Sequence, residues 1–142
     1  MKRCAPDPRE NPAVGNGSGA TDDGTVTLSI PGDPAYLRLA RLAAADTGAR
    51  AGLSVSDLED LRIAVDELAY ALIGPDHKGA PLTLSYRATA GSVEIDGTCA
   101  GGGPPAALSE LAQTIVAVIA DEHEIHDDGE TRRFHFVKRS HD

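Results

Sequence analysis

The spacing of apolar residues predicts three helices and five strands between residues 25 and 138. Apolar residues repeat at steps of three and four along the helical segments, which is the period of an amphipathic helix. Alternating and β-branched residues mark the shorter segments as strands. The expected helices are residues 34–50, 54–74 and 105–120, and the expected strands are residues 25–30, 81–88, 92–96, 122–127 and 130–138.

The helix over 54–74 has the clearest boundaries. Ser56-x-x-Glu59 forms a capping-box pattern near its start, and Ser54 is an alternative N-cap. Gly74 followed by Pro75 is expected to end the helix. The stripe of this helix that is expected to be buried consists of Leu58, Leu61, Val65, Leu68 and Leu72.

The helix over 34–50 is expected to begin at Pro34, with Asp33 as its N-cap. Its apolar side is expected to contain Leu39, Leu42 and Ala43. The order of all the elements is strand, helix, helix, strand, strand, helix, strand, strand. Because strands and helices do not alternate strictly, this order predicts an α+β fold. We expect a two-layer sandwich with helices on one face of a mixed, mainly antiparallel sheet.

The first 24 residues differ in composition from the rest of the chain. They are rich in Pro, Gly, Asn, Ser and Asp, and they lack the apolar mass that would offset the entropy cost of ordering. We therefore predict a disordered N-terminal arm over residues 1–24 and one domain over residues 25–142.

Charge and cysteine content narrow the class of partner. The net charge of −9 argues against nucleic acid, and the one basic run, "TRRFHFVKR" (131–139), alternates as if its charged residues lay on the wet face of a strand. No apolar run approaches the roughly 18 residues that span a membrane. Cys4 and Cys99 form neither a disulfide framework nor a metal-binding pattern, so a cytoplasmic setting is expected. His123 and His126 would point to opposite faces of a strand, which argues against a metal site there.

Three polar positions are candidates for chemistry. Glu67 shares a helix face with Ile63 and Ala71 and flanks the buried stripe, as the wall of a cleft would. Asp96 ends a strand and precedes the glycine-rich segment 97–103, where the backbone could approach a ligand. Thr131 begins the last strand. Each also has an ordinary structural interpretation, respectively as the polar margin of a helix, the cap of a turn and a plain strand residue.

Residues 59–73, "EDLRIAVDELAYALI", together with "PGDPAYLRLAR" (31–41) and "GLSVSDLEDLRIAV" (52–65), resemble the bacterial anti-sigma-factor serine kinases. That family belongs to the GHKL ATPase superfamily, together with the histidine kinases. The resemblance covers about residues 25–138 and implies the Bergerat, or histidine-kinase-like ATPase, fold.

The resemblance also implies roles for individual residues. Glu67 matches the glutamate that acts as the base towards the attacking hydroxyl group. Asp96 matches the aspartate that binds the adenine amino group, and Thr131 matches the threonine that supports this aspartate through water. Gly97, Gly101 and Gly103 belong to the loop where the ATP lid begins. ATP is the cofactor implied.

The chain departs from the family pattern at the metal site. Ala71 stands where the family has the asparagine that holds Mg²⁺, and a methyl group cannot ligate a cation that requires oxygen. Thr98 and Ala100 stand at the glycine positions of Asp-x-Gly-x-Gly when the motif is counted from Asp96. The resemblance implies an anti-sigma regulator that binds a sigma factor or its antagonist, as a homodimer. An ATP-dependent serine kinase, a pseudokinase and a nucleotide-independent interaction domain remain as alternatives, and Ala71 favours the pseudokinase.

Overall fold

The five strands form one sheet in the order β1-β2-β3-β5-β4, and every neighbouring pair is antiparallel. The chain is described here by a computed structural model over residues 24–74, 80–100 and 108–141. The predicted arm lies outside these residues except for Gly24. The strands are β1 (Val26–Ile30), β2 (Leu82–Thr89), β3 (Ser92–Ala100), β4 (Glu122–Asp127) and β5 (Thr131–Arg139).

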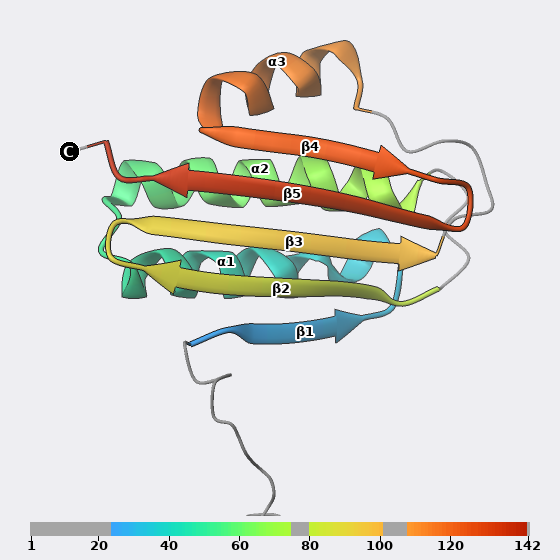
Figure 1. Ribbon diagram of the computed structural model, residues 1–142, viewed down its shortest axis with the longest axis horizontal. Coiled ribbons are helices and arrows are strands. Elements are labelled where there is room, and N and C mark those ends of the chain that lie inside the picture. Colours follow the sequence, from blue (N-terminus) through green and yellow to red (C-terminus); the bar gives the residue numbers. More distant parts are fainter. Residues whose placement is uncertain (1–23, 75–79, 101–107, 142) are drawn as a thin grey trace, which may run out of the picture.

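The helices cover one face of this sheet, which confirms the predicted two-layer α+β fold. Helices α1 (Leu37–Arg50) and α2 (Val55–Ile73) lie side by side behind β2, β3 and β5 (Figure 1). The opposite face of the sheet has no helix from the described residues over it. Helix α3 (Glu110–Ile119) packs against α2 near the β4 edge. None of the helices in the described residues is long and apolar enough to cross a membrane.

Short polar contacts set the ends of the helices. Asp33 accepts a hydrogen bond from the backbone N–H of Ala35 at 2.9 Å, and a single 3₁₀ turn (Pro34–Tyr36) then leads into α1. Ser54, rather than Ser56, caps α2. Gly74 ends α2 with a φ of +78°, a left-handed value that glycine adopts without strain.

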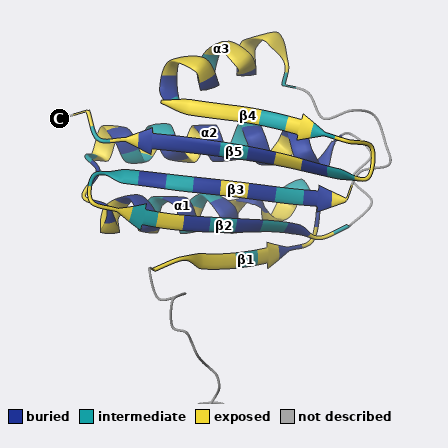
Figure 2. Cartoon of the chain, viewed as in Figure 1, coloured by how far each residue is buried: buried dark blue, intermediate teal, exposed yellow. Residues whose placement is uncertain are grey.

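The core lies between the sheet and helices α1 and α2 (Figure 2). Its largest fully buried side chains are Tyr86, Phe134 and Phe136, from the central strands. The Tyr86 hydroxyl donates a hydrogen bond to the carbonyl oxygen of Ala40 at 2.9 Å and so links the two layers. Burial raises the pKa of the Tyr86 hydroxyl well above its ordinary value, so it remains a donor.

The predicted apolar side of α1 is wrong for its two leucines, whereas the third predicted residue, Ala43, packs against the core. Leu39 and Leu42 are 47% and 58% exposed, whereas Leu37, Ala40 and Ala44 are buried. Alanines let the helix backbone approach its neighbours more closely than leucines would. The buried face of α1 is therefore built from small residues, which a simple count of large apolar positions overlooks.

Two element boundaries differ from the prediction by four or more residues, namely the end of β3 and the start of α3. Strand β3 continues to Ala100, four residues beyond Asp96, because β2 and β5 both pair with it there. Residues 97–100 are therefore strand, not loop. Helix α3 begins after its N-cap Ser109, whose hydroxyl accepts from the N–H of Ala112 at 3.1 Å, rather than at residue 105.

The basic run in β5 is divided between the two faces of the sheet. Arg133, His135 and Arg139 lie on the open face, as the alternation predicted. Arg132 and Lys138 do not, because they share the buried face with Phe134 and Phe136, and only 4% and 3% of their surfaces are exposed. The sequence interpretation of these two cations as solvated was wrong.

Candidate functional site

Glu67 lies half-buried on α2, between exposed Ile63 and buried Ala71. Within the described residues it makes no hydrogen bond or ion pair. Its neighbour Asp66 does, because Arg41 of α1 approaches Asp66 with a nitrogen–oxygen distance of 2.6 Å. The two neighbouring acidic residues therefore differ in role. Asp66 joins α1 to α2, whereas Glu67 lies at the border of the core.

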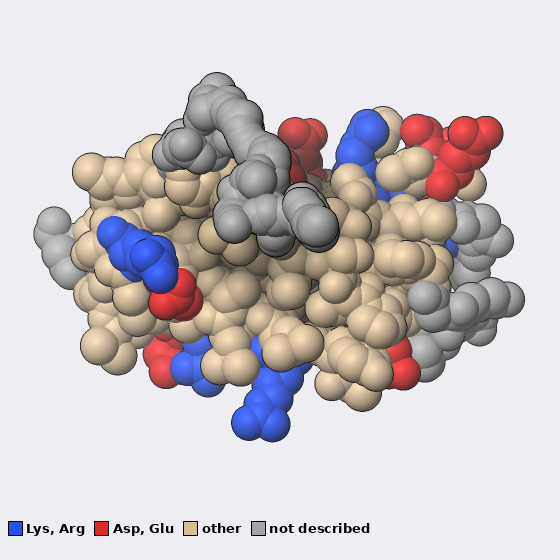
Figure 3. Space-filling view, turned by 90° about the horizontal axis from the view of Figure 1, so that it is seen from below, with Lys and Arg blue, Asp and Glu red and all other residues tan. Residues whose placement is uncertain are grey.

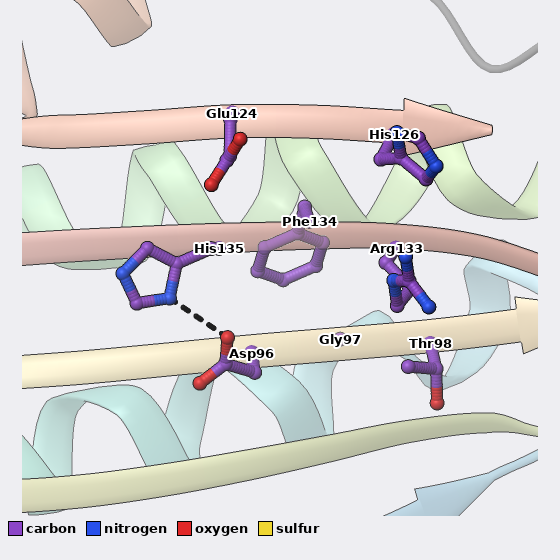
Figure 4. A pocket seen from close by; sticks show the side chains of 8 residues that line it. All are labelled: Asp96, Gly97, Thr98, Glu124, His126, Arg133, Phe134 and His135. Carbon is purple, nitrogen blue, oxygen red and sulfur yellow. Dashed lines mark hydrogen bonds and ion pairs between the residues drawn. The ribbon is translucent and has the colours of Figure 1, made fainter.

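Asp96 lies on the other side of the sheet from Glu67. In β3, Ile95 and Gly97 face the core, so Asp96 between them faces the open side, where 52% of its side chain is exposed. It forms a hydrogen bond with Nδ1 of His135 at 2.7 Å (Figure 4). Because the sheet separates Glu67 from Asp96, the structure does not bring these two predicted site residues together.

The remaining predicted residues do not gather around Asp96 either. Gly97 packs under the ring of Phe134, and a Cβ atom added to it would lie 2.4 Å from Cε2 of that ring. Thr131 pairs with Ala100, four residues along β3 from Asp96, or about 13 Å away. Its N–H donates to Asp128 at 2.8 Å. Gly101 and Gly103 lie outside the described residues.

His135 gains charge stabilisation from its neighbours. Partial burial acts to lower the pKa of His135, but the hydrogen bond and the charge of Asp96, with Glu94 and Glu124, outweigh it and raise the pKa. The second ring nitrogen, Nε2, lies 3.6 Å from the Glu94 carboxylate. The Asp96 carboxylate is thus engaged with a histidine on the open face.

Sequence reasoning missed a buried arginine at the C-terminal end of α2. Nη1 of Arg132 donates to the carbonyl oxygen of Leu72 at 3.1 Å, and Nε lies 3.4 Å from Asp127. A Cβ atom on Gly74 would lie 3.0 Å from Nη1. The signal was available in the sequence, since Arg132 alternates with Phe134 and so shares its face.

Cys99 pairs with Arg132 and faces the same helical side of the sheet. Burial raises the pKa of the Cys99 thiol, and the charge of Arg132 offsets this only in part. Cys99 also stands two residues before Gly101 and four before Gly103. In the family's Asp-x-Gly-x-Gly motif, glycines lie two and four residues after the aspartate. Counted back from Gly101 and Gly103, the position of that aspartate is Cys99, whose side chain is a neutral thiol.

Comparison with known proteins supports the resemblance drawn from the helix sequences. A serine-protein kinase RsbW from Listeria innocua is 33% identical over 79 residues, which cover 54% of this chain and 50% of the relative. RsbW proteins from Listeria monocytogenes are 36% identical over 70 residues, covering 47% of this chain and 45% of theirs. The chain resembles the RsbW serine-protein kinases. It spans about half the length of these RsbW relatives, and no protein-family profile matches it.

The fold agrees with this resemblance to RsbW. A crystal structure of the RsbU and RsbW domains of a Mycobacterium tuberculosis protein superimposes with a TM-score of 0.63. The match covers 81% of this chain and 32% of that one, at 14% sequence identity. At this identity the match speaks for the fold alone. The prediction of a histidine-kinase-like fold is confirmed.

Proposed function

We propose that this chain is an anti-sigma regulatory domain that binds a sigma factor or the antagonist of one, without Mg²⁺-dependent phosphoryl transfer. The similarity to RsbW along half of the chain and the RsbW-like fold support the regulatory part. The residues around the C-terminal end of α2 support the absence of Mg²⁺-dependent phosphoryl transfer. Ala71 offers no oxygen ligand there, and the guanidinium group of Arg132 lies buried against Leu72 and Asp127.

These residues do not fit a magnesium nucleotide. The neutral thiol of Cys99 is a weak acceptor for the amino group of adenine. The fixed positive charge of Arg132 would repel a magnesium ion bound nearby. Within the described residues no group of three or more histidine, cysteine or acidic side chains could hold a metal ion. In this proposal Glu67 has no role as a base and remains part of the surface that binds the partner.

The partner surface that we propose is the outer face of α1 and α2. Five large apolar side chains are exposed on these helices. They are Leu39 and Leu42 on α1, and Val55, Ile63 and Tyr70 on α2. Figure 3 faces the neighbouring β1 edge of the molecule, where uncharged residues lie between scattered charged side chains. Large apolar side chains form the centre of many protein interfaces, so the exposed apolar residues of α1 and α2 suit a protein partner.

Binding to the sigma factors and antagonist proteins encoded in the same genome tests the regulatory part. We expect at least one of them to bind the purified chain in calorimetry, and Leu42→Glu to weaken that binding at least about tenfold, because a charge would enter the apolar contact. Val118→Glu in α3, where the side chain is 80% exposed, is the matched control and should leave affinity unchanged. If no sigma factor or antagonist binds, the proposal fails.

ATP titration with and without Mg²⁺ tests the second part independently. We expect Mg²⁺ to add no affinity, because Ala71 cannot supply an oxygen ligand. The same titration on Ala71→Asn shows whether one substitution restores a response to Mg²⁺. Binding enhanced by Mg²⁺ in the unaltered chain, or transfer of phosphate to a bound partner, would overturn this part and leave the regulatory part intact.

A further inference from the structure

The open face of the sheet carries a shallow groove that the proposed function does not use. Its volume is about 500 Å³, and polar side chains of β3, β4 and β5 line it (Figure 4). None of the helices formed by residues 24–74, 80–100 and 108–141 covers this face (Figure 1). The polar side chains of the groove are Asp96, Thr98, Glu124, His126, Arg133 and His135.

Strand register arranges these six side chains in two rows across the sheet. Arg133 pairs with Thr98 on one side and with His126 on the other, which forms the first row. His135 pairs in the same way with Asp96 and Glu124, which forms the second row. The rows are two residues apart along each strand, so they lie about 7 Å from each other.

The two rows differ in charge. The first row contains the guanidinium group of Arg133, which is exposed and makes no ion pair within the described residues. The second row contains two carboxylates and one imidazole, and His135 is already hydrogen-bonded to Asp96. The groove is therefore positive at one end and negative at the other.

We propose that this groove is the docking site for an extended peptide segment of a partner protein, with an acidic residue and, two positions along, a basic residue. In an extended chain, side chains two positions apart point the same way and repeat at about 7 Å, which matches the separation of the rows. The acidic side chain would meet the planar fork of Arg133, which suits a carboxylate. The basic side chain would meet Asp96 and Glu124.

Blocked synthetic peptides test this proposal. One contains Asp-Ala-Lys within flanking glycines, and its isomer of equal charge contains Asp-Lys-Ala, whose two charged side chains point to opposite sides of an extended chain. In a nuclear magnetic resonance titration of the full chain, we expect saturable shifts at the amides of the groove. Because exposed ion pairs are weak, we expect millimolar dissociation constants, with the spaced peptide binding about threefold to tenfold more tightly than its isomer.

A charge reversal shows whether Arg133 makes the contact. Arg133→Glu should abolish binding of the Asp-Ala-Lys peptide and create binding of a Lys-Ala-Lys peptide. Arg139→Gln, on the same face of β5 but outside the groove, should change neither result. Arg133→Gln is a milder variant should the reversal disturb the fold.

Three outcomes would overturn the proposal. These are equal affinity for the two isomers, no groove shifts up to the solubility limit of the peptides, and binding that survives both Arg133 variants. None of these residues belongs to the helical surface, so failure here would leave the anti-sigma proposal untouched.

Discussion

A single residue of β5, Lys138, places a positive charge in the interior of this domain. Lys138 is almost fully buried, yet its Nζ lies 3.2 Å from Asp60 and 3.6 Å from Asp57, and it donates to the carbonyl oxygen of Ile119 at 3.0 Å. A buried cation with three oxygen neighbours is compensated, whereas a buried carboxylate that loses its cation is not. Lys138 therefore joins β5 to the start of α2 and the end of α3.

Lys138→Met tests whether this compensated charge stabilises the folded domain. We expect a loss of about 3 kcal/mol in the free energy of unfolding, because Asp57 would stay buried without its cation. Arg139→Gln is the matched control, since Arg139 and Glu122 form an exposed pair that water screens, so its loss should change stability far less. Urea unfolding of both variants measures the difference, and equal losses would contradict the assignment.

His135 gives a prediction for pH. Its pKa is raised, so its charged form stabilises the folded state fully below the ordinary pKa of about 6.5, and this stabilisation is lost as pH rises through the folded pKa. Asp96→Asn removes the hydrogen-bonded carboxylate and should lower the pKa of His135. Nuclear magnetic resonance titration of the His135 ring measures both values. An unchanged pKa in the variant would show that Asp96 is not the partner in solution.

Elements are fixed by their neighbours as much as by their own sequence. Strand β3 runs past Asp96 because β2 and β5 continue on either side of it, so Gly97 lies within a central strand. A glycine usually weakens a strand, but here it leaves room for the ring of Phe134. A residue that the sequence linked to a nucleotide loop thus has a packing role that the structure shows directly.

Gly97→Ala should therefore destabilise the domain, although alanine normally suits a strand better than glycine. The added methyl would meet the Phe134 ring at 2.4 Å, so we expect a loss of about 1–3 kcal/mol in the free energy of unfolding. Thr98→Ala, on the open side of the same strand, should change stability by less than about 0.5 kcal/mol. A Gly97→Ala variant as stable as the parent would show that the ring can move aside.

At the scale of the whole molecule, the one-sided sheet separates two surfaces. Helices α1 and α2 bury one face and carry Glu67, while the open face carries Asp96 and the groove (Figure 1). Protection from solvent also differs across the sheet, because β1 and β4 are its edges and most of their residues are exposed. A partner can therefore contact one face without displacing anything on the other.

This arrangement predicts the order of hydrogen exchange. Amides of β3 and β5 should exchange only when the whole domain unfolds, whereas those of β1 and β4 should also exchange through local opening at the edges. Native-state exchange followed by nuclear magnetic resonance measures this strand by strand. If β1 proved as strongly protected as β3, its free edge would be covered in solution.

The sequence by itself determined the order and type of nearly all the elements, the cap at Asp33, and the resemblance to RsbW. It left Ser54 and Ser56 as alternative caps of α2, and the structure shows that Ser54 is the cap. These features depend on local chemistry: periodicity marks which segments are helices or strands, and capping side chains bond to the backbone within three residues. The Ala71 substitution was also visible in the sequence, because it lies inside the helix that carries the resemblance.

The tertiary structure decided several placements that the sequence left open. The sequence could not show that alanines rather than Leu39 and Leu42 form the buried side of α1, because that depends on how closely α2 and the sheet approach. Nor could it show that Asp96 and Glu67 lie on opposite sides of the sheet, since a strand turns each successive side chain to the other face and the register fixes which. Alternation puts Arg132 on the same face as Phe134, but this face becomes the interior only because β5 pairs with β3 and β4, and that pairing forms when the whole sheet assembles.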